Sequence, residues 1–201
     1  MEHLPNIKII GLTGMSGAGK STACEVFRRR GFSIVDCDKI AWAVASDRDF
    51  LNELQSRFPE KLLNDDGSLN RVVTAKAIFG DESNRRLYNQ IIFPYIGYRM
   101  IREIRSAGGD VLLDAPTLFD AGLEMICTEI VGVTASAEIC ARRIIKRDSI
   151  TPERAAERLS AQYGEEFLKE HCDHIIENNG AIRDFIKRAE KITDKLKGGL
   201  W

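Results

Sequence analysis

Short apolar segments alternate with longer stretches of helical periodicity along this chain. Isoleucine, valine and leucine dominate the short segments, so both faces of each predicted strand are apolar. Strands of this kind, separated by helices, are typical of a parallel sheet that is covered on both faces. The pattern therefore predicts the α/β class, with a doubly wound sheet of five strands. The predicted strands span residues 7–12, 32–35, 110–114, 129–134 and 174–176.

Two stretches between the predicted strands are too long to be single crossover helices. Residues 36–109 contain helical patterns at 50–58 and 84–105, with breaks expected at Pro59, at 64–67 and at Pro94. We expect a helical substrate-binding cap at about 48–107, over the carboxyl edge of the sheet, where doubly wound folds bind substrate. Residues 139–171 contain the helix start Thr151-Pro152 and predict a mobile lid. The core then comprises about 6–47, 108–138 and 172–196, within a single domain of residues 1–201.

The composition is that of an ordinary folded domain. The 201 residues include 29 Lys and Arg against 30 Asp and Glu, and 44% are hydrophobic. The net charge of −1 lacks the basic excess that is typical of a dedicated nucleic-acid binder. No apolar run approaches the ~20 residues that span a bilayer, and residues 1–6 lack the layout of a signal peptide. We expect a cytoplasmic protein that binds neither nucleic acid nor membrane.

The cysteine and histidine residues predict neither a disulfide framework nor a metal site. The five cysteines are odd in number and widely spaced in a chain long enough to have a core. His171, Cys172 and His174 lie close together in sequence, but a second cluster of metal ligands is missing. We therefore interpret this stretch as a helix end that runs into a strand.

The strongest chemical signal is the segment GMSGAGKS at residues 14–21, which follows the first predicted strand and begins a helix. It fits the pattern Gly-x-x-x-x-Gly-Lys-Ser/Thr in its required strand–loop–helix setting. Glycines let backbone N–H groups converge on an anionic phosphate, and the helix N-terminus adds partial positive charge. Lys20 can reach the β- and γ-phosphates of a nucleotide, and the Ser21 hydroxyl can bind Mg²⁺. We predict ATP binding through Gly14, Gly17, Ala18, Gly19, Lys20, Ser21 and Thr22.

Asp114 is a second candidate for the metal. It ends an apolar predicted strand, as the acidic residue of such phosphate sites usually does, and would hold Mg²⁺ directly or through water. The alternative is a residue that forms the turn at the strand end before Pro116.

The phosphate loop alone is compatible with switches, motors, transporters and small-molecule kinases. The chain has no room for the appended modules of most motors, and it lacks the Asn-Lys-x-Asp motif with which switch GTPases recognise guanine. A compact kinase with a helical cap and a lid remains.

An ordered set of motifs narrows the class further. They are GLTG (11–14), GAGKST (17–22), VDCD (35–38), GSLNR (67–71), AIF (77–79), YNQIIFP (88–94), LDAPTLF (113–119), RIIKRD (143–148), RLSAQ (158–162) and IENNG (176–180). In this order and spacing, over most of its length, the chain resembles the dephospho-coenzyme A kinase family. It departs from the family pattern at Met15-Ser16, usually Gly-Ile, at Asn70, usually acidic, at Phe93, usually His, and at Thr117, usually Leu.

The resemblance implies transfer of the ATP γ-phosphate to the ribose 3′-hydroxyl of dephospho-coenzyme A, the last step of coenzyme A synthesis. The hydroxyl needs a carboxylate that takes its proton. By the family match this base is Asp38, just past the second predicted strand, and Asp36 orients or caps. The alternative for Asp38 is the N-cap of a helix that begins at Lys39.

Basic residues gather in the predicted lid, with six between Arg142 and Arg158 against three acidic ones. Phosphoryl transfer needs cations around the moving group, and Arg147 is the first choice for this role, while a solvated helix face is the alternative. The resemblance also implies ATP contacts from Arg143 and, at the adenine edge through backbone atoms, from Asn178 and its neighbours. Acceptor contacts are expected from Thr13, Asp38, Arg71, Leu118, Arg158 and Gln162, with Arg71 on the phosphate groups of the substrate.

Two other readings of the chain remain open. One is another P-loop small-molecule kinase, of the nucleoside monophosphate or shikimate type, which the 35–38 element and the long helical insertion do not favour. The other is a nucleotide-dependent binding module. The chain has neither a heptad seam nor a long basic tail, so we expect no obligatory protein partner.

Overall fold

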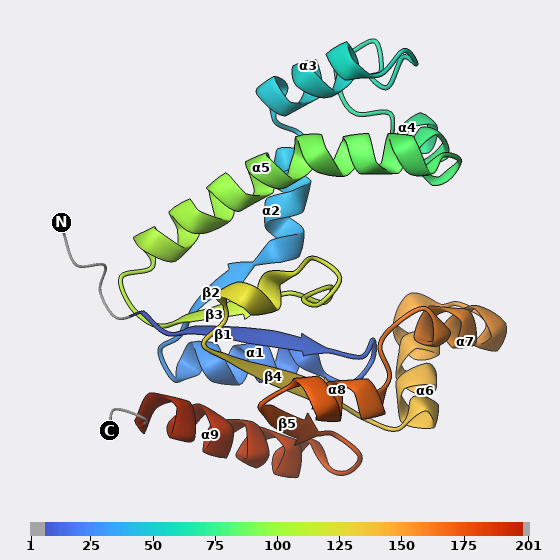
Figure 1. Cartoon of the computed structure of the whole chain (residues 1–201). Helices are drawn as coiled ribbons and strands as arrows, with labels where there is room; N and C mark the ends of the chain where they lie inside the picture. The colour runs from blue at the N-terminus through green and yellow to red at the C-terminus, as the bar shows by residue number, and fades with distance from the viewer. Residues whose placement is uncertain (1–6, 199–201) are drawn as a thin grey trace. The chain divides into compact units, whose positions relative to one another are not determined.

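The chain divides into two units, one built on a parallel β-sheet and the other made of helices (Figure 1). The structure is a computed structural model that describes residues 7–198. The first unit contains the chain up to Val35 and from Ala107 onward, and the second contains Asp36–Ser106. Residues 1–6, which entered the expectation about a signal peptide, lie outside the described residues, as do 199–201.

The sheet confirms the five predicted strands and the α/β class. Strand β1 lies at its centre, in the order β2-β3-β1-β4-β5, and β1 pairs in parallel with β3 and with β4. The chain thus moves from one side of β1 to the other after β3, and doubly wound folds bind ligands at such a point, outside the carboxyl ends of the strands. The strands span Ile9–Gly14 (β1), Ser33–Asp36 (β2), Val111–Asp114 (β3), Glu129–Thr134 (β4) and His174–Glu177 (β5).

Helices of the first unit bury their apolar positions against this sheet. Phe27 of α1 and Phe185 of α9 are almost completely buried in one core with Ile10 and Leu12 of β1. Thr151 caps α7, and Pro152 is its first residue, as the sequence predicted. The helices of this unit are α1 (Lys20–Arg29), the 3-10 helix η1 (Leu123–Ile126), α6 (Ala137–Asp148), α7 (Pro152–Ser160), α8 (Glu165–His171) and α9 (Ile182–Gly198).

The second unit has its own core, in which the Phe50 ring contacts the rings of Tyr88 and Tyr95 edge to face. Asp47 accepts hydrogen bonds at the start of α3 and pairs with Arg99 of α5. The unit begins at Asp36, before the expected start of the cap at residue 48, because α2 packs on α5. Its helices are α2 (Cys37–Val44), α3 (Arg48–Arg57), α4 (Arg71–Phe79) and α5 (Glu82–Ser106).

The prediction of a helix break at Pro94 was wrong. Helix α5 continues through this proline. A proline inside a helix costs about 3 kcal/mol because it removes one hydrogen bond and crowds the preceding turn. Ile91 and Ile92 before it, and Tyr95 and Ile96 after it, all pack in the core of the unit. This packing offsets the cost, and the helix persists.

Among the described residues, no helix has both the length and the apolar character that crossing a membrane requires.

Candidate functional site

The phosphate loop joins the end of β1 to the start of α1, and its shape depends on glycine, as Gly17 and Gly19 show. Gly17 and Gly19 have φ values of 80° and 112°, in the left-handed region. A Cβ at Gly17 would lie 2.7 Å from the carbonyl oxygen of Cys140, and one at Gly19 would lie 2.5 Å from Nδ2 of Asn178. The loop therefore keeps this shape only with glycine at both positions.

Two side chains hold the loop by its carbonyl oxygens. Arg143 Nη1 donates to the carbonyls of Gly17 and Ala18 at 3.1 and 3.4 Å, and Nη2 donates to the carbonyl of Asn178 at 3.2 Å. The Asn178 amide donates to the Ala18 carbonyl at 2.7 Å. The first N–H groups of a helix have no partner within it, and no side chain of the described residues caps α1. Arg143 and Asn178 thus hold the loop by its carbonyls, and an anion at the start of α1 would meet N–H groups that have no partner within the helix.

Asn178 is held by its backbone as well as by its side chain, and its predicted contact with adenine stays a prediction. The residue is only 3% exposed. Its N–H donates to the Thr134 carbonyl at 2.8 Å, and its own carbonyl accepts from Arg143. Both backbone groups thus have partners inside the protein, and we assign Asn178 to support of the loop. A direct contact of Arg143 with ATP stays a prediction.

Lys20 and Asp114 form an ion pair at the carboxyl edge of the sheet. Lys20 Nζ donates to Asp114 Oδ1, and their side chains are 17% and 16% exposed. Asp114 ends β3 opposite Leu12 of β1, which places it beside the loop. The structure thus brings together two residues that the sequence proposed separately, and the Asp114 side chain is directed at the site rather than into a turn.

Asp148 gathers two of the predicted lid arginines. Its carboxylate accepts from Arg147 Nε and Nη2 at 2.7 and 2.9 Å, and from Arg158 Nη1 at 2.5 Å. Hydrogen bonds from Arg147 and then Arg158 lower the pKa of Asp148 to about 2. The carboxylate is therefore ionised and holds the two guanidinium groups close together. The sequence did not single out this aspartate.

Gln162 connects the phosphate loop to α7. Its Oε1 accepts from the Ser16 N–H at 2.9 Å, and its Nε2 donates to the Ser16 hydroxyl and to the Arg158 carbonyl, both at 2.9 Å. Gln162 thus has partners within the protein, and its contact with the acceptor stays a prediction. Serine at position 16 supplies a hydroxyl to this link, which isoleucine would not.

Two further residues that were predicted to contact the acceptor, Thr13 and Leu118, are buried. The Thr13 hydroxyl donates to the Pro116 carbonyl at 3.2 Å, and the residue is 3% exposed. Leu118 is fully buried, and its Cδ1 lies 2.6 Å from where a Cβ on Gly11 would be. Both side chains are packed inside the protein, and a contact of either with the acceptor stays a prediction.

In the second unit, the structure distinguishes the two aspartates of the VDCD motif. Asp36 is the N-cap of α2, and its Oδ1 accepts from the Lys39 N–H at 3.0 Å. The helix begins at Cys37, so Asp38 is an exposed residue of its first turn. The alternative in which Asp38 caps a helix from Lys39 is therefore wrong, and capping belongs to Asp36.

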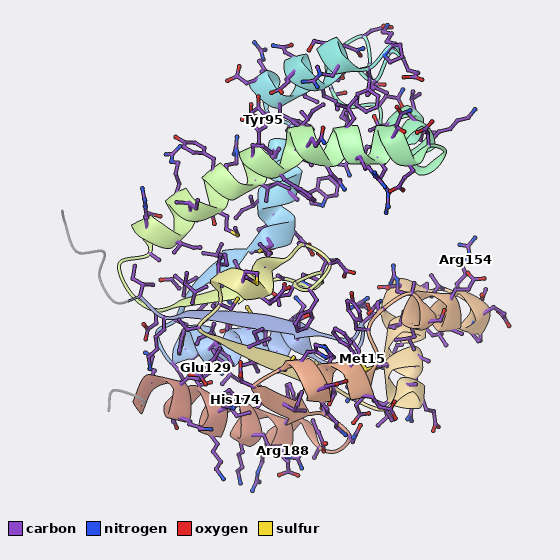
Figure 2. The ribbon with its side chains drawn as sticks, viewed as in Figure 1. Met15, Tyr95, Glu129, Arg154, His174 and Arg188 are labelled. Carbon is purple, nitrogen blue, oxygen red and sulfur yellow. The ribbon has the colours of Figure 1, made fainter. Side chains whose placement is uncertain are left out.

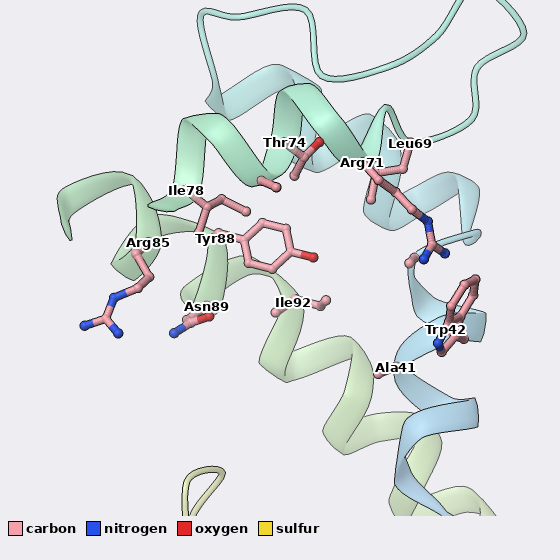
Figure 3. Close-up of a pocket in the computed structure, with 12 residues that line it drawn as sticks. Ala41, Trp42, Leu69, Arg71, Thr74, Ile78, Arg85, Tyr88, Asn89 and Ile92 are labelled. Carbon is pink, nitrogen blue, oxygen red and sulfur yellow. The ribbon is translucent and has the colours of Figure 1, made fainter. Parts of the chain in front are cut away.

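The second unit also contains a cavity of about 510 Å³ between α2, α4 and α5 (Figure 3). Arg71 lines it, and its guanidinium carbon lies 3.6 Å from the ring centre of Trp42. Asn70 caps α4 by accepting from the Val73 N–H at 3.1 Å. Asparagine therefore serves as the helix cap where the family usually has an acidic residue.

The histidines near β5 have partners within the protein. His174 Nε2 lies 2.7 Å from Glu129 Oε2, where β4 and β5 begin (Figure 2). The ring of His171 stacks on that of Phe167 with centres 3.9 Å apart. Helix α8 ends at His171 and β5 begins at His174, which confirms the predicted helix end and strand. In the part of the chain that the structure describes, no group of three acidic, cysteine or histidine residues could hold a metal ion.

Comparison with known proteins places these features in one family. A family model described as dephospho-CoA kinase matches residues 8–184. The dephospho-CoA kinase of Fusobacterium nucleatum is 31% identical over 95% of this chain and 100% of its own length. That of Listeria monocytogenes is 33% identical over 94% and 97%.

Solved structures of similar proteins share the fold of this chain. A protein from Thermus thermophilus superimposes with a TM-score of 0.83 at 28% identity, covering 97% of this chain and 98% of its own. A dephospho-CoA kinase from Campylobacter jejuni has a TM-score of 0.62 at 21% identity, covering 96% and 98%, and supports the fold.

Proposed function

The chain belongs to the dephospho-CoA kinase family, and from this premise we propose that it phosphorylates the ribose 3′-hydroxyl of dephospho-coenzyme A. ATP supplies the γ-phosphate, and the products are coenzyme A and ADP. The observation that carries the proposal is the family match over residues 8–184, which includes the phosphate loop and the VDCD motif. The protein is a kinase and therefore a transferase.

The triphosphate of ATP binds at the phosphate loop. Backbone N–H groups of the loop and the start of α1 meet the phosphates, and Lys20 turns from Asp114 to the β- and γ-phosphates. The Lys20–Asp114 pair supports this role, because the lysine is already held at the carboxyl edge beside the loop.

Ser21 and Asp114 would hold Mg²⁺, since a hydroxyl and a carboxylate are the oxygen ligands that this ion prefers. Few protein ligands suffice, because Mg²⁺ in kinases keeps waters and binds phosphate oxygens. When bound, the ion neutralises charge on the phosphates.

Asp38 takes the proton of the attacking hydroxyl. The ribose 3′-oxygen forms a bond to the γ-phosphorus, and the bond from that phosphorus to the β–γ bridging oxygen breaks. The bonding electrons leave with ADP, and the proton goes to the Asp38 carboxylate. Asp36 is engaged as the cap of α2, which supports Asp38 rather than Asp36 as the base.

Arg147 stabilises the transferred phosphate, and Arg158, held at the same Asp148 carboxylate, contacts the acceptor. The bidentate contact to Asp148 uses Nε and Nη2 of Arg147. The remaining N–H groups on Nη1 suit a phosphate oxygen without loss of that contact. Arg71 binds phosphate groups of the acceptor that do not react.

A panel of acceptors tests the proposal. Purified protein is incubated with ATP, Mg²⁺ and one of dephospho-coenzyme A, a nucleoside monophosphate, shikimate or no acceptor, and ADP release is followed. Release that depends on dephospho-coenzyme A supports the proposal. Release that depends on another acceptor, with none on dephospho-coenzyme A, overturns it in favour of a different small-molecule kinase.

A further inference from the structure

We propose that the cavity of the second unit holds the pantetheine arm of the acceptor, with the adjoining diphosphate at Arg71. The inference rests on the proposed function, because it takes dephospho-coenzyme A as the acceptor. It adds which part of that molecule the cavity recognises, and which side chains recognise it.

The cavity has the size and lining of a small-molecule site. Its volume of about 510 Å³ lies within the range of roughly 300–1,000 Å³ that is common for such sites. All of the lining residues belong to the second unit, and they include Ala45 at the end of α2. Ile78 of α4 and Ile92 of α5 also line the cavity (Figure 3). An apolar wall of this kind suits the branched aliphatic part of pantetheine, and the space exceeds what a single base would fill.

Polar residues of the lining suit an amide ligand. Thr74 lines the cavity, is 4% exposed, and its hydroxyl has no hydrogen-bond partner in the part of the chain that the structure describes. Buried hydroxyls almost always have a partner, because leaving one unbonded is destabilising. The amide of Asn89 also lines the cavity. An amide group of the pantetheine arm would accept from Thr74 and complete its hydrogen bonding.

Arg71 marks the end of the cavity that receives phosphate. Its guanidinium group lies over the ring of Trp42, with 3.6 Å from Cζ to the ring centre. This cation–π contact fixes the plane of the guanidinium and leaves its N–H edges for phosphate oxygens. A diphosphate at Arg71 would therefore introduce the group that follows it into the cavity.

The order of groups along α2 matches the order of groups in the acceptor. Asp38, Trp42 and Ala45 are separated by four and three positions, so they lie on one face of the helix. At ~1.5 Å per residue, Asp38 is roughly 10 Å along the helix from Ala45. The reacting ribose at Asp38, the diphosphate at Arg71 and the arm beside Ala45 then follow one another. Adenine is attached to the reacting ribose without a diphosphate between them, and its placement in the cavity would leave Arg71 without that partner.

The fluorescence of Trp42 can report whether a ligand occupies the cavity. The chain has two tryptophans, Trp42 and Trp201, so Trp201→Phe leaves the one beside Arg71. We expect 4′-phosphopantetheine and dephospho-coenzyme A to change the emission of Trp42 in a saturable titration, and AMP to leave it unchanged. A response to AMP without one to 4′-phosphopantetheine would place the base in the cavity and overturn the proposal, as would the absence of any response.

Thr74 variants in the same background test the hydrogen bond. Thr74→Val keeps the shape and removes the hydroxyl, and we expect 4′-phosphopantetheine to bind about 2- to 10-fold more weakly. Thr74→Ser keeps the hydroxyl and should bind several-fold more tightly than Thr74→Val. Equal affinities for the two variants would contradict the role of the hydroxyl.

Turnover separates this proposal from the proposed function. Coenzyme A formation with no response of Trp42 to 4′-phosphopantetheine overturns the assignment of the arm and leaves the function standing. A saturable response without any coenzyme A formation overturns the function and supports a pantetheine site.

Discussion

The support of the phosphate loop by Asn178 leads to a prediction about both stability and ATP. Asn178→Ala removes the hydrogen bond from Nδ2 to the Ala18 carbonyl at 2.7 Å and the weaker contact of Arg143 with Oδ1 at 3.4 Å. The Ala18 carbonyl then keeps the 3.4 Å bond from Arg143. We expect the variant to fold, to be less stable, and to bind ATP more weakly because the loop is no longer held in shape.

The magnitude follows from the burial of the bond. Removing one partner of a buried hydrogen bond costs about 1–3 kcal/mol. With a slope of about 2 kcal/mol per M, a loss of about 2 kcal/mol lowers the urea midpoint by about 1 M. If ATP must restore the shape of the loop when it binds, the same loss of about 2 kcal/mol is taken from its binding free energy. The Michaelis constant for ATP then rises by up to about 30-fold, since about 1.4 kcal/mol changes a binding constant tenfold.

Urea unfolding and steady-state kinetics on the same preparations measure both effects. Asn179→Ala is the matched control, because its side chain accepts from the Ser136 N–H at 2.8 Å in an exposed position. We expect the control to lose less than about 1 kcal/mol. If Asn178→Ala has the urea midpoint of the wild type but a raised Michaelis constant for ATP, the idea that Asn178 supports the loop is refuted. That result would favour direct contact of Asn178 with the nucleotide.

Three further variants test the chemistry of phosphoryl transfer, and a fourth tests the ionisation of one tyrosine. Lys20→Ala should lower turnover by roughly 10²–10³-fold while the urea midpoint shows a folded protein, and near-normal turnover would contradict the assignment. Asp38→Asn should lower the maximal rate by roughly 10²–10⁴-fold with little change in ATP affinity, and an effect on affinity alone would remove it as the base. Arg147→Ala should lower the maximal rate by roughly 10–100-fold and leave the Michaelis constant for the acceptor nearly unchanged; the reverse split would assign it to acceptor binding. The hydrogen bond that Tyr95 donates to Glu53 at 2.8 Å raises the pKa of Tyr95 to about 12. Its contribution to stability is therefore present below about pH 10 and lost as the pH rises through 12. Tyr95→Phe should remove the last step of a phenolate absorbance titration, and an unchanged last step would contradict the assignment.

Most of the fold could be predicted from the sequence, because buried parallel strands are apolar on both faces. All five strands appear as such segments, and the Thr151-Pro152 start of α7 follows from local capping chemistry. Helix α4 was missed as a separate helix, because apolar residues occur all around it and leave no polar face that would reveal the helical period. The continuation of α5 through Pro94 depends on packing of both of its halves, which no local rule contains.

The candidate site could be predicted where a motif carries the chemistry and not where tertiary contacts do. The loop, Lys20 and Asp114 follow from local pattern. The contacts of Arg143 and Asn178 with Ala18 join residues 125 and 160 positions apart, and only the folded chain brings them together. Leu118 is a further example of a residue that only the folded chain places. It follows the end of a strand, which is compatible with a surface loop, but its side chain is buried beside Gly11.

The central claim is tested most directly by the chemical identity of the product. Wild-type protein is incubated with ATP, Mg²⁺ and dephospho-coenzyme A, and the mixture is separated by liquid chromatography with mass-spectrometric detection. We predict coenzyme A that co-elutes with the authentic compound and carries its phosphate on the ribose 3′-oxygen, in equal amount with ADP. With the Lys20→Ala variant we expect the same product to form roughly 10²–10³-fold more slowly. ADP without coenzyme A, or a phosphorylated product of a different position, would contradict the account.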